Sequence, residues 1–280
     1  MSVLTEPKID AHCHVLDPAR FPYAPDVSYR PHGQETGSAA YFAQVLSAYG
    51  STHALLVGPN SGYGYDNRCL LDAIAHGGGR FKGIAVLRDD TGSAELKDLR
   101  ARGILGVAFN YALHGLPFYA GATGLMRRLA DLDMFVNVQV EKDQMAQLAP
   151  VLRDAGARIL VDHCGRPDVR EGVQGAGFQA LLGLARHGRT TVKLSGYAKF
   201  SEQDLPFDDT LPFTRALLDG FGPDHCIWAS DWPFLKAPRR LDYGALLQDF
   251  ARRVPDPAQR HAILWRTPAR LFGFEAASAA

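Results

Sequence analysis

The sequence lacks the features that mark several specialised classes of protein. Its 280 residues contain only four cysteines and no CxxC pair, which argues against a disulfide framework or a zinc ribbon. Neither sign of charge is in excess, with 30 basic and 30 acidic side chains, so neither nucleic acid nor an anionic membrane is an expected partner. No apolar run approaches the roughly 18 residues of a membrane span, and the N-terminal sequence MSVLTEPKID has no apolar signal core. We therefore expect a globular protein of the cytoplasm.

Short apolar segments alternate with amphipathic segments along the whole chain. The predicted strands are residues 9–14, 53–58, 81–87, 104–110, 135–140, 158–163, 190–195 and 226–231. The predicted helices are residues 39–49, 66–75, 93–101, 123–132, 142–155, 178–187, 206–221, 241–253 and 258–272. Eight βα units are typical of a single (β/α)₈ TIM barrel, an α/β fold, here one domain over residues 1–280 with an extra C-terminal helix. The alternative is a doubly wound sheet, which often has a GxGxxG turn that this chain lacks.

Polar residues end several of the predicted strands, and in a barrel these ends carry the catalytic groups. His12 and His14 are two residues apart, so they share a face at the end of the first strand. Two imidazoles in this place rarely serve packing alone. His163 ends the sixth strand and Asp231 ends the eighth. We interpret these four residues as the catalytic candidates.

Further polar side chains lie on the fourth, fifth and seventh strands. Asn110 ends the fourth strand, and Asn137 and Gln139 alternate with valines on the fifth, which predicts that both face the barrel interior. Lys193 and Ser195 share a face of the seventh strand, with Tyr197 just beyond it. Asp162 has an ordinary structural interpretation as the cap of the turn after its strand.

A long loop follows the first strand, from residue 16 to residue 37. It is rich in proline, tyrosine, aspartate and glycine, and so long a loop in a compact domain is usually functional. The sequence leaves open whether the loop is a lid over the site or a contact in a homo-oligomer.

Six motifs together resemble the amidohydrolase-related family of metal-dependent hydrolases and their metal-free relatives. The motifs are Asp10-Ala11-His12-Cys13-His14, Tyr65-Asp66-Asn67-Arg68, Gly106-Val107-Ala108-Phe109-Asn110, Val161-Asp162-His163-Cys164-Gly165-Arg166-Pro167, Val192-Lys193-Leu194-Ser195-Gly196 and Ala229-Ser230-Asp231-Trp232-Pro233. The resemblance covers nearly the whole chain and is closest to the branch of 2-pyrone-4,6-dicarboxylate lactonase and sugar-acid lactonases. It implies a hydrolase that acts on a small lactone.

The chain departs from the family pattern at the metal site. The resemblance implies that a single metal is held by the two histidines of strand one, a histidine ending strand five and the aspartate of strand eight. Here strand five ends in Gln139, and glutamine is a poor ligand for Zn²⁺. We expect no metal cofactor. The alternative is a single Zn²⁺ or Mn²⁺ held by His12, His14 and Asp231.

A second departure concerns the substrate. The resemblance implies that arginines on and after strand four clamp the carboxylates of pyrone dicarboxylate, but the matching positions hold Ala108 and His114. Alanine offers no charge and histidine only a partial one near neutral pH. We therefore expect a different carboxylate-bearing lactone. The substrate-binding candidates are Arg166, Ser195, Tyr197, Asn110, Gln139, His114, Arg68, Lys193 and Lys199.

The predicted reaction is hydrolysis of the cyclic ester by water that Asp231 activates as general base. His12, His14 and His163 are predicted to donate hydrogen bonds to the lactone carbonyl, which gains negative charge in the transition state. Three alternatives remain: a lactone isomerase on the same scaffold, a metal-dependent decarboxylase and a non-enzymatic binding barrel. Convergence of so many polar groups at one barrel mouth counts against the last.

Overall fold

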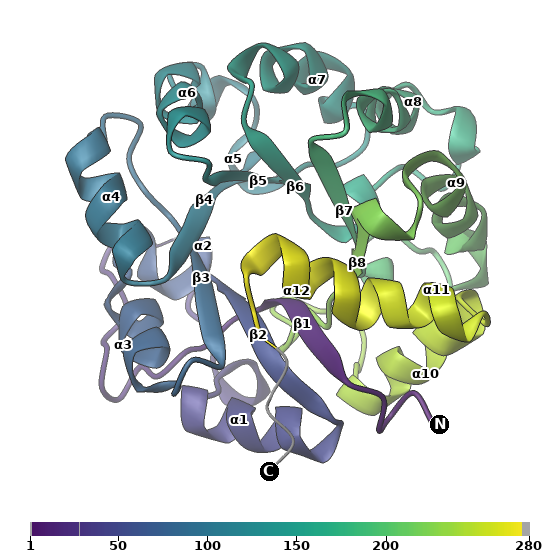
Figure 1. The fold of residues 1–280 in the computed structure, drawn as a ribbon, viewed down its shortest axis with the longest axis horizontal. Helices are drawn as coiled ribbons and strands as arrows, with labels where there is room; N and C mark the ends of the chain where they lie inside the picture. Colours follow the sequence, from purple (N-terminus) through teal and green to yellow (C-terminus); the bar gives the residue numbers. More distant parts are fainter. Residues whose placement is uncertain (1, 28, 276–280) are drawn as a thin grey trace.

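The computed structural model describes residues 2–27 and 29–275, so Met1, Ser28 and residues 276–280 of the predicted domain lie outside the described residues. Its centre is one eight-stranded parallel sheet in which each strand pairs with the next along the chain. The strands are β1 (Lys8–Cys13), β2 (Ser51–Val57), β3 (Phe81–Ala85), β4 (Ile104–Asn110), β5 (Phe135–Gln139), β6 (Arg158–Val161), β7 (Thr190–Leu194) and β8 (Cys226–Trp228). A bridge between Cys13 and Trp232 joins the first strand to the segment after the last. The predicted (β/α)₈ barrel is therefore confirmed (Figure 1).

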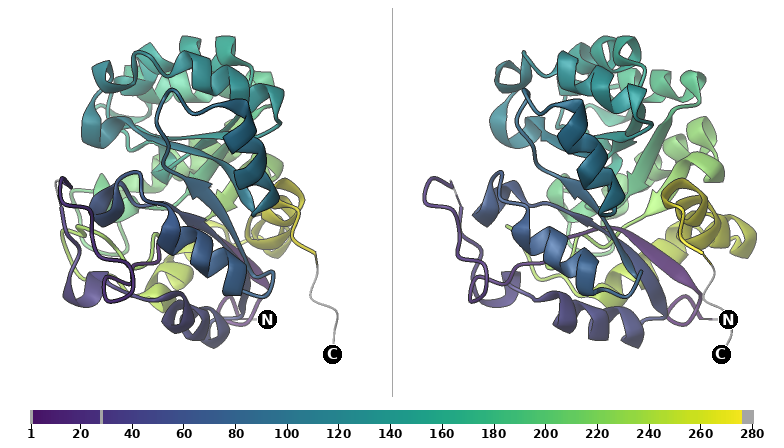
Figure 2. Two further views of the ribbon diagram at one scale, coloured as in Figure 1. Left: turned by 90° about the vertical axis from the view of Figure 1, so that its left-hand side faces the viewer. Right: turned by 60° about the vertical axis from the view of Figure 1, so that its left-hand side comes forward.

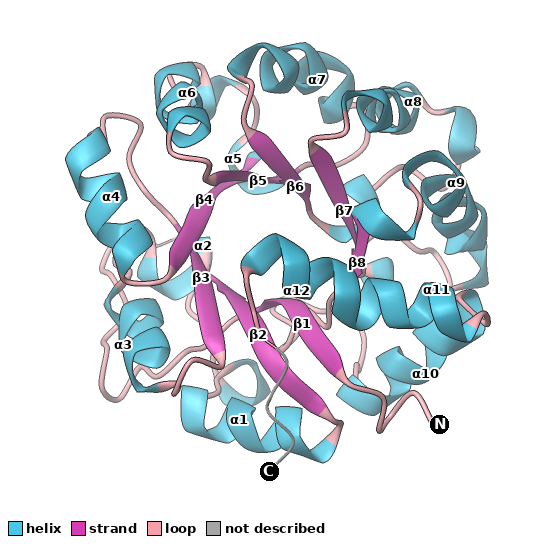
Figure 3. Cartoon of the chain, in the orientation of Figure 1, coloured by secondary structure: helices cyan, strands magenta, loops and turns pink. Residues whose placement is uncertain are grey.

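Helices flank the sheet on its outer side and at the ends of the barrel (Figure 3). They are α1 (Ala39–Ala48), α2 (Asn60–Tyr63), α3 (Arg68–His76), α4 (Ser93–Ala101), α5 (Tyr111–His114), α6 (Thr123–Asp131), α7 (Gln144–Ala155), α8 (Ala176–Gly183), α9 (Leu211–Phe221), α10 (Tyr243–Arg253), α11 (Pro257–His261) and α12 (Thr267–Phe272). The predicted extra C-terminal helix is present. Phe272 at its end packs edge to face against Phe135 at the start of β5, with 5.9 Å between the ring centroids. This contact places α12 over the amino-terminal end of the barrel, away from the strand ends that carry the polar groups.

Several predicted elements are shorter or more broken than the sequence pattern indicates. The helix predicted over residues 206–221 begins at Leu211, since Phe207 has a φ of 57°, outside the helical region. The strand predicted to reach Asp231 ends at Trp228, because Asp231 itself has a φ of 62°. The C-terminal helix, predicted as one piece, is α11, a π-helical turn at Ala262–Arg266 and α12. Among the described residues, no helix is both long and apolar enough to cross a membrane.

The loop after β1 lies at the opposite end of the barrel from α12 (Figure 2). Its ends meet where Leu16 bridges Gly37. Its middle is hydrogen-bonded to the short α2 turn, where the Ala24 amide donates to the Gly62 carbonyl over 2.8 Å and the Gly62 amide donates to the Tyr29 carbonyl over 2.9 Å. The loop is thus fixed against a segment that follows β2 at the mouth of the barrel.

Candidate active site

The junction of β1 with the segment after β8 brings the first and last catalytic candidates together. The Asp231 amide donates to the His12 carbonyl over 2.8 Å, and the His14 amide donates to the Trp232 carbonyl over 2.7 Å. The pairing of β1 with β2 is irregular between Asp10 and Cys13. Such irregularities redirect side chains near active sites. His12 lies within this irregular stretch and His14 follows it. Both line the same pocket, as their spacing predicts.

Three imidazoles surround one oxygen of Asp231. The Asp231 Oδ1 atom lies 3.6 Å from His12 Nε2, 3.5 Å from His14 Nε2 and 3.5 Å from His163 Nε2. Burial alone would raise the pKa of Asp231, but Lys199 and the imidazoles outweigh it and hold the pKa well below the usual carboxyl value. Asp231 is therefore ionised at neutral pH, as the proposed general base must be.

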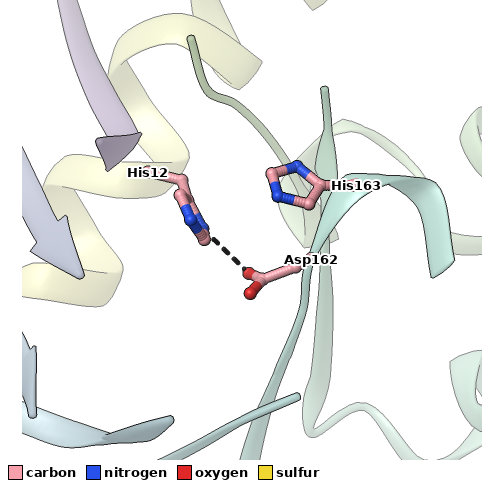
Figure 4. A group of neighbouring side chains, drawn as sticks. All are labelled: His12, Asp162 and His163. Carbon is pink, nitrogen blue, oxygen red and sulfur yellow. Dashed lines mark hydrogen bonds and ion pairs between the residues drawn. The ribbon is translucent and has the colours of Figure 1, made fainter. Parts of the chain in front are cut away.

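The opposite nitrogen of each ring has a partner that fixes its orientation. His14 Nδ1 lies 2.8 Å from the Val57 carbonyl, which only accepts, so Nδ1 carries a proton. His12 Nδ1 lies 3.1 Å from Asp162 Oδ1 (Figure 4) and also 3.1 Å from the Lys193 ammonium, which only donates. These two contacts orient the His12 ring without fixing which nitrogen holds its proton. Burial lowers the pKa of His12 to about 4, so the ring is neutral at pH 7.

The second nitrogen of each ring is turned toward one point. His12, His14 and His163 were expected to donate hydrogen bonds to the lactone carbonyl, and the Nε2 atoms of all three lie around Asp231 Oδ1. His163 Nδ1 lies 3.0 Å from the Ser195 hydroxyl, which can act as the donor and leave the proton on Nε2. That tautomer of His163 is compatible with the donor role.

A buried polar network below the histidines was not predicted. Lys193 Nζ lies 2.8 Å from Asp162 Oδ1 and 2.7 Å from Asn137 Oδ1. The Asn137 amide donates to Asp162 Oδ2 over 2.9 Å. All of these side chains are buried, and nearby positive charge and hydrogen bonds outweigh burial to lower the pKa of Asp162. Asp162 is thus the orienting partner of His12 rather than only the cap of a turn, and Asn137 faces the barrel interior as predicted.

Three of the four catalytic candidates line a pocket of about 380 Å³, a volume that suits a small molecule. His163 does not line it and contacts Asp231 from behind, over 3.5 Å. Of the predicted residues, the pocket is lined by His12, His14, Asn110, Gln139, Arg166, Lys199 and Asp231. The sequence reasoning did not single out Asn60 or Lys236, which also line it. Asn60 begins the one-turn helix α2 and Lys236 lies in the loop after β8, and neither segment is long enough for periodicity to mark an inward direction. Ala108 lines the pocket too, so the first expected arginine position faces the substrate space without a charge.

Other predicted substrate-binding residues lie away from the pocket. Lys193 is in the network below it, and Ser195 lies behind His163. Tyr197 is buried under the Arg253 guanidinium, 3.8 Å from its ring centroid. Arg68 pairs with Asp66 on the surface, over 2.7 Å. His114 stacks on Phe118 with 4.4 Å between centroids and is not among the lining residues. None of these five residues lines the pocket.

Two cations at the pocket have carboxylate partners. Lys199 Nζ lies 2.9 Å from Asp231 Oδ2, so it holds the second oxygen of the proposed base. Arg166 pairs with Glu141 over 3.0 Å, while its buried Nε has no hydrogen-bond partner among the described residues. An unpaired buried donor is costly unless a ligand satisfies it. Arg166 also lines the pocket, so part of its guanidinium faces the space that a small molecule would occupy.

The donor set also fits a divalent metal ion. The ligand atoms of His12, His14 and Asp231 lie within 4.8 Å of one another, as do those of His12, Asp162 and His163. His12 Nε2 is buried without a hydrogen-bond partner among the described residues. A neutral imidazole whose far nitrogen is held by a carboxylate or a carbonyl is the usual arrangement of a metal ligand. Strand five ends in Gln139 and supplies no histidine nitrogen near Asp231. His163 supplies one.

Comparison with known proteins places these features in context. A family model described as Amidohydrolase matches residues 9–274. A 4-sulfomuconolactone hydrolase of Rhizobium radiobacter is 35% identical, over 94% of this chain and 89% of its own. A 2-pyrone-4,6-dicarboxylate hydrolase of Comamonas testosteroni is 28% identical, over 94% of this chain and 89% of its own. The crystal structure of a probable 2-pyrone-4,6-dicarboxylic acid hydrolase of Acinetobacter baumannii, with citric acid bound, superimposes with a TM-score of 0.85 at 28% identity, over 95% of this chain and 99% of that one.

Proposed function

The chain belongs to the amidohydrolase family, and on that premise we propose that it hydrolyses a small lactone that carries an anionic group. The observation that carries the proposal is the ring of three imidazole Nε2 atoms around Asp231 Oδ1, in a pocket with Arg166 and Lys199. The relatives named above are lactone hydrolases whose names specify sulfonated or carboxylated rings. Because Ala108 stands where an arginine is expected, the substrate differs from pyrone dicarboxylate.

In the proposed mechanism Asp231 accepts a proton from the attacking water. The water oxygen bonds to the carbonyl carbon, and the developing negative charge on the carbonyl oxygen is stabilised by N–H groups of the imidazoles around Asp231 and by the Arg166 guanidinium, which lines the pocket. The ring C–O bond then breaks, and the proton held by Asp231 passes to the departing ring oxygen. The product is a hydroxy acid, or its keto tautomer when the ring oxygen was enolic. Its new carboxyl group releases one proton near neutral pH.

His12, His14 and Asp231 would hold a metal ion, with His163 close by. A bound Zn²⁺ or Mn²⁺ supplies a more acidic water and polarises the carbonyl. Without it, His12 and His14, which line the pocket beside Asp231, orient the attacking water through hydrogen bonds.

The first experiment is acid release in weak buffer with a pH indicator, on a panel of lactones. The panel contains muconolactone, its 4-sulfo derivative, pyrone dicarboxylate and aldonolactones. We expect the highest kcat/KM on a muconolactone and at least tenfold less on pyrone dicarboxylate, since the pocket lacks the second arginine clamp. A lactone isomerase would change the substrate without net acid release. Release of CO₂ would identify a decarboxylase instead.

If the isolated protein carries a metal ion, its removal is expected to lower the turnover by at least about 100-fold, because the ion would polarise the carbonyl and supply a more acidic water. The protein is dialysed against a chelator, its metal content is measured, and activity is recorded before and after addition of Zn²⁺ or Mn²⁺. Full turnover of metal-depleted protein would instead support the metal-independent reaction that Gln139 predicts. In that case Asp231 and the histidines are the whole catalytic machinery.

We also propose that residues 1–280 act as one domain in the cytoplasm on a small molecule, without nucleic acid. The four cysteines are all buried free thiols, as is usual in a reducing compartment. A homo-oligomer is compatible with the exposed apolar side chains Leu113 and Phe118, which are 39% and 50% exposed. Light scattering during size-exclusion chromatography measures the oligomeric state.

A further inference from the structure

One cation at the pocket is not paired with a carboxylate. Arg166 and Lys199 pair with Glu141 and Asp231, which compensates their charges. Lys236, in the loop after β8, also lines the pocket. Within residues 2–27 and 29–275, no carboxylate lies within ion-pair distance of its ammonium group. The mouth of the pocket therefore carries an uncompensated positive charge at this position.

The long loop after β1 fixes where Lys236 lies. The Lys236 amide donates to Glu35 Oε1 over 2.6 Å, and the Tyr29 hydroxyl donates to the other oxygen of the same carboxylate. The Lys236 ammonium lies over the Tyr29 ring, 4.5 Å from its centroid. An ammonium group has three donors, so contact with one aromatic face leaves N–H groups free for a ligand. Tyr29 and Glu35 thus position Lys236 without neutralising its side chain.

The other side of the pocket is uncharged. The first residue of α2 and the last residues of β4 and β5 contribute Asn60, Asn110 and Gln139. Arg166, Lys199 and Lys236 come instead from the loops after β6, β7 and β8. A substrate with an anionic substituent is therefore bound in one orientation, with its charge toward β8. Amides on the opposite wall suit a neutral polar part of the ring.

We propose that Lys236 is the specificity-determining residue that binds the carboxylate or sulfonate of the lactone, held for this role by Tyr29 and Glu35. The inference rests on the proposed function for the identity of the substrate, but it makes a separate statement about anion binding. In this proposal the loop of residues 16–37 has a function in binding, because it supports the anion-binding wall of the pocket.

The test compares Lys236→Met with Lys236→Arg and with the wild-type protein. Titration calorimetry with glutarate, a simple dicarboxylate, measures anion binding without turnover. We expect Lys236→Met to raise the Kd for glutarate about tenfold, as for loss of one hydrogen bond to a charged group. Lys236→Arg is expected to remain within about threefold of wild type, because the charge is kept. On a carboxylated lactone, Lys236→Met should raise KM by a similar factor and leave kcat within about twofold.

The matched control is Arg240→Met, in the same loop. Arg240 pairs with Asp242 at the surface and does not line the pocket, so glutarate binding and KM should stay at wild-type values. A neutral lactone should show no difference between Lys236→Met and wild type. Equal glutarate affinity of wild type and Lys236→Met, including the case in which neither binds, would overturn the inference. Failure of the lactone panel with tenfold weaker glutarate binding would overturn only the proposed reaction.

Discussion

Replacing Asp231 by asparagine is expected to lower the turnover number for lactone hydrolysis by at least about 100-fold, the usual contribution of a general base. Asp231 Oδ1 lies 3.5 Å from the Nε2 atoms of His14 and His163. In the proposed mechanism it deprotonates a water that lies between this cluster and the substrate carbonyl. Asparagine keeps the size of the side chain but does not accept a proton near neutral pH. KM should change much less than kcat, because the anionic group is bound elsewhere in the pocket.

The control for this variant is Asp242→Asn, which removes a carboxylate that pairs with Arg240 on the surface. Its turnover should equal that of wild type. Circular dichroism of both variants verifies that the barrel is folded. Turnover of Asp231→Asn at the wild-type level, on the best lactone of the panel, would remove Asp231 from the mechanism and shift attention to Lys199, its ion-pair partner.

The barrel could be predicted from the sequence because all of its strands are covered by helices outside and by packed side chains inside. A strand such as Ile104–Asn110 is therefore an almost continuous apolar run, and both of its predicted limits agree with the structure. The ends of other strands follow local backbone geometry that residue type does not reveal. His163 and Asp231 both have positive φ values, 51° and 62°, which side-chain-bearing residues rarely adopt. Such strained positions gather at functional sites.

Strand periodicity predicted part of the site. His12 and His14 share a face, so both were identified, and Asn137 was placed inside the barrel for the same reason. Lys193 was also recognised, but as a substrate ligand, because a lysine at the end of a strand looks the same whether it faces solvent or a buried carboxylate. Only the pairing of β6 with β7 in the sheet shows that the partner of Lys193 is Asp162. Lys236 depends on a contact with Tyr29 from the far end of the chain, which no local pattern encodes.

Replacing Asp162 by asparagine is expected to lower the Tm of the protein by roughly 10 °C. The Lys193 ammonium and the Asp162 carboxylate are 2.8 Å apart and almost completely buried, with side-chain exposures of 0% and 2%. Removing one charge of a buried pair costs about 3–5 kcal/mol, because the other charge stays in the interior uncompensated. For a protein of this size each kcal/mol shifts Tm by about 2–4 °C. Calorimetry or circular dichroism on heating measures the change.

The double variant Asp162→Asn with Lys193→Met separates stability from function. Because it leaves no unpaired charge, it should recover at least half of the lost Tm, whereas additive losses would show that the two residues are not coupled. Its hydrolytic activity should nevertheless stay about 10- to 100-fold below wild type. The reason is His12, whose Nδ1 loses the carboxylate 3.1 Å away that orients its ring and turns Nε2 toward Asp231. Recovery of full activity together with stability would show that Asp162 only balances the charge of Lys193 and has no part in orienting His12.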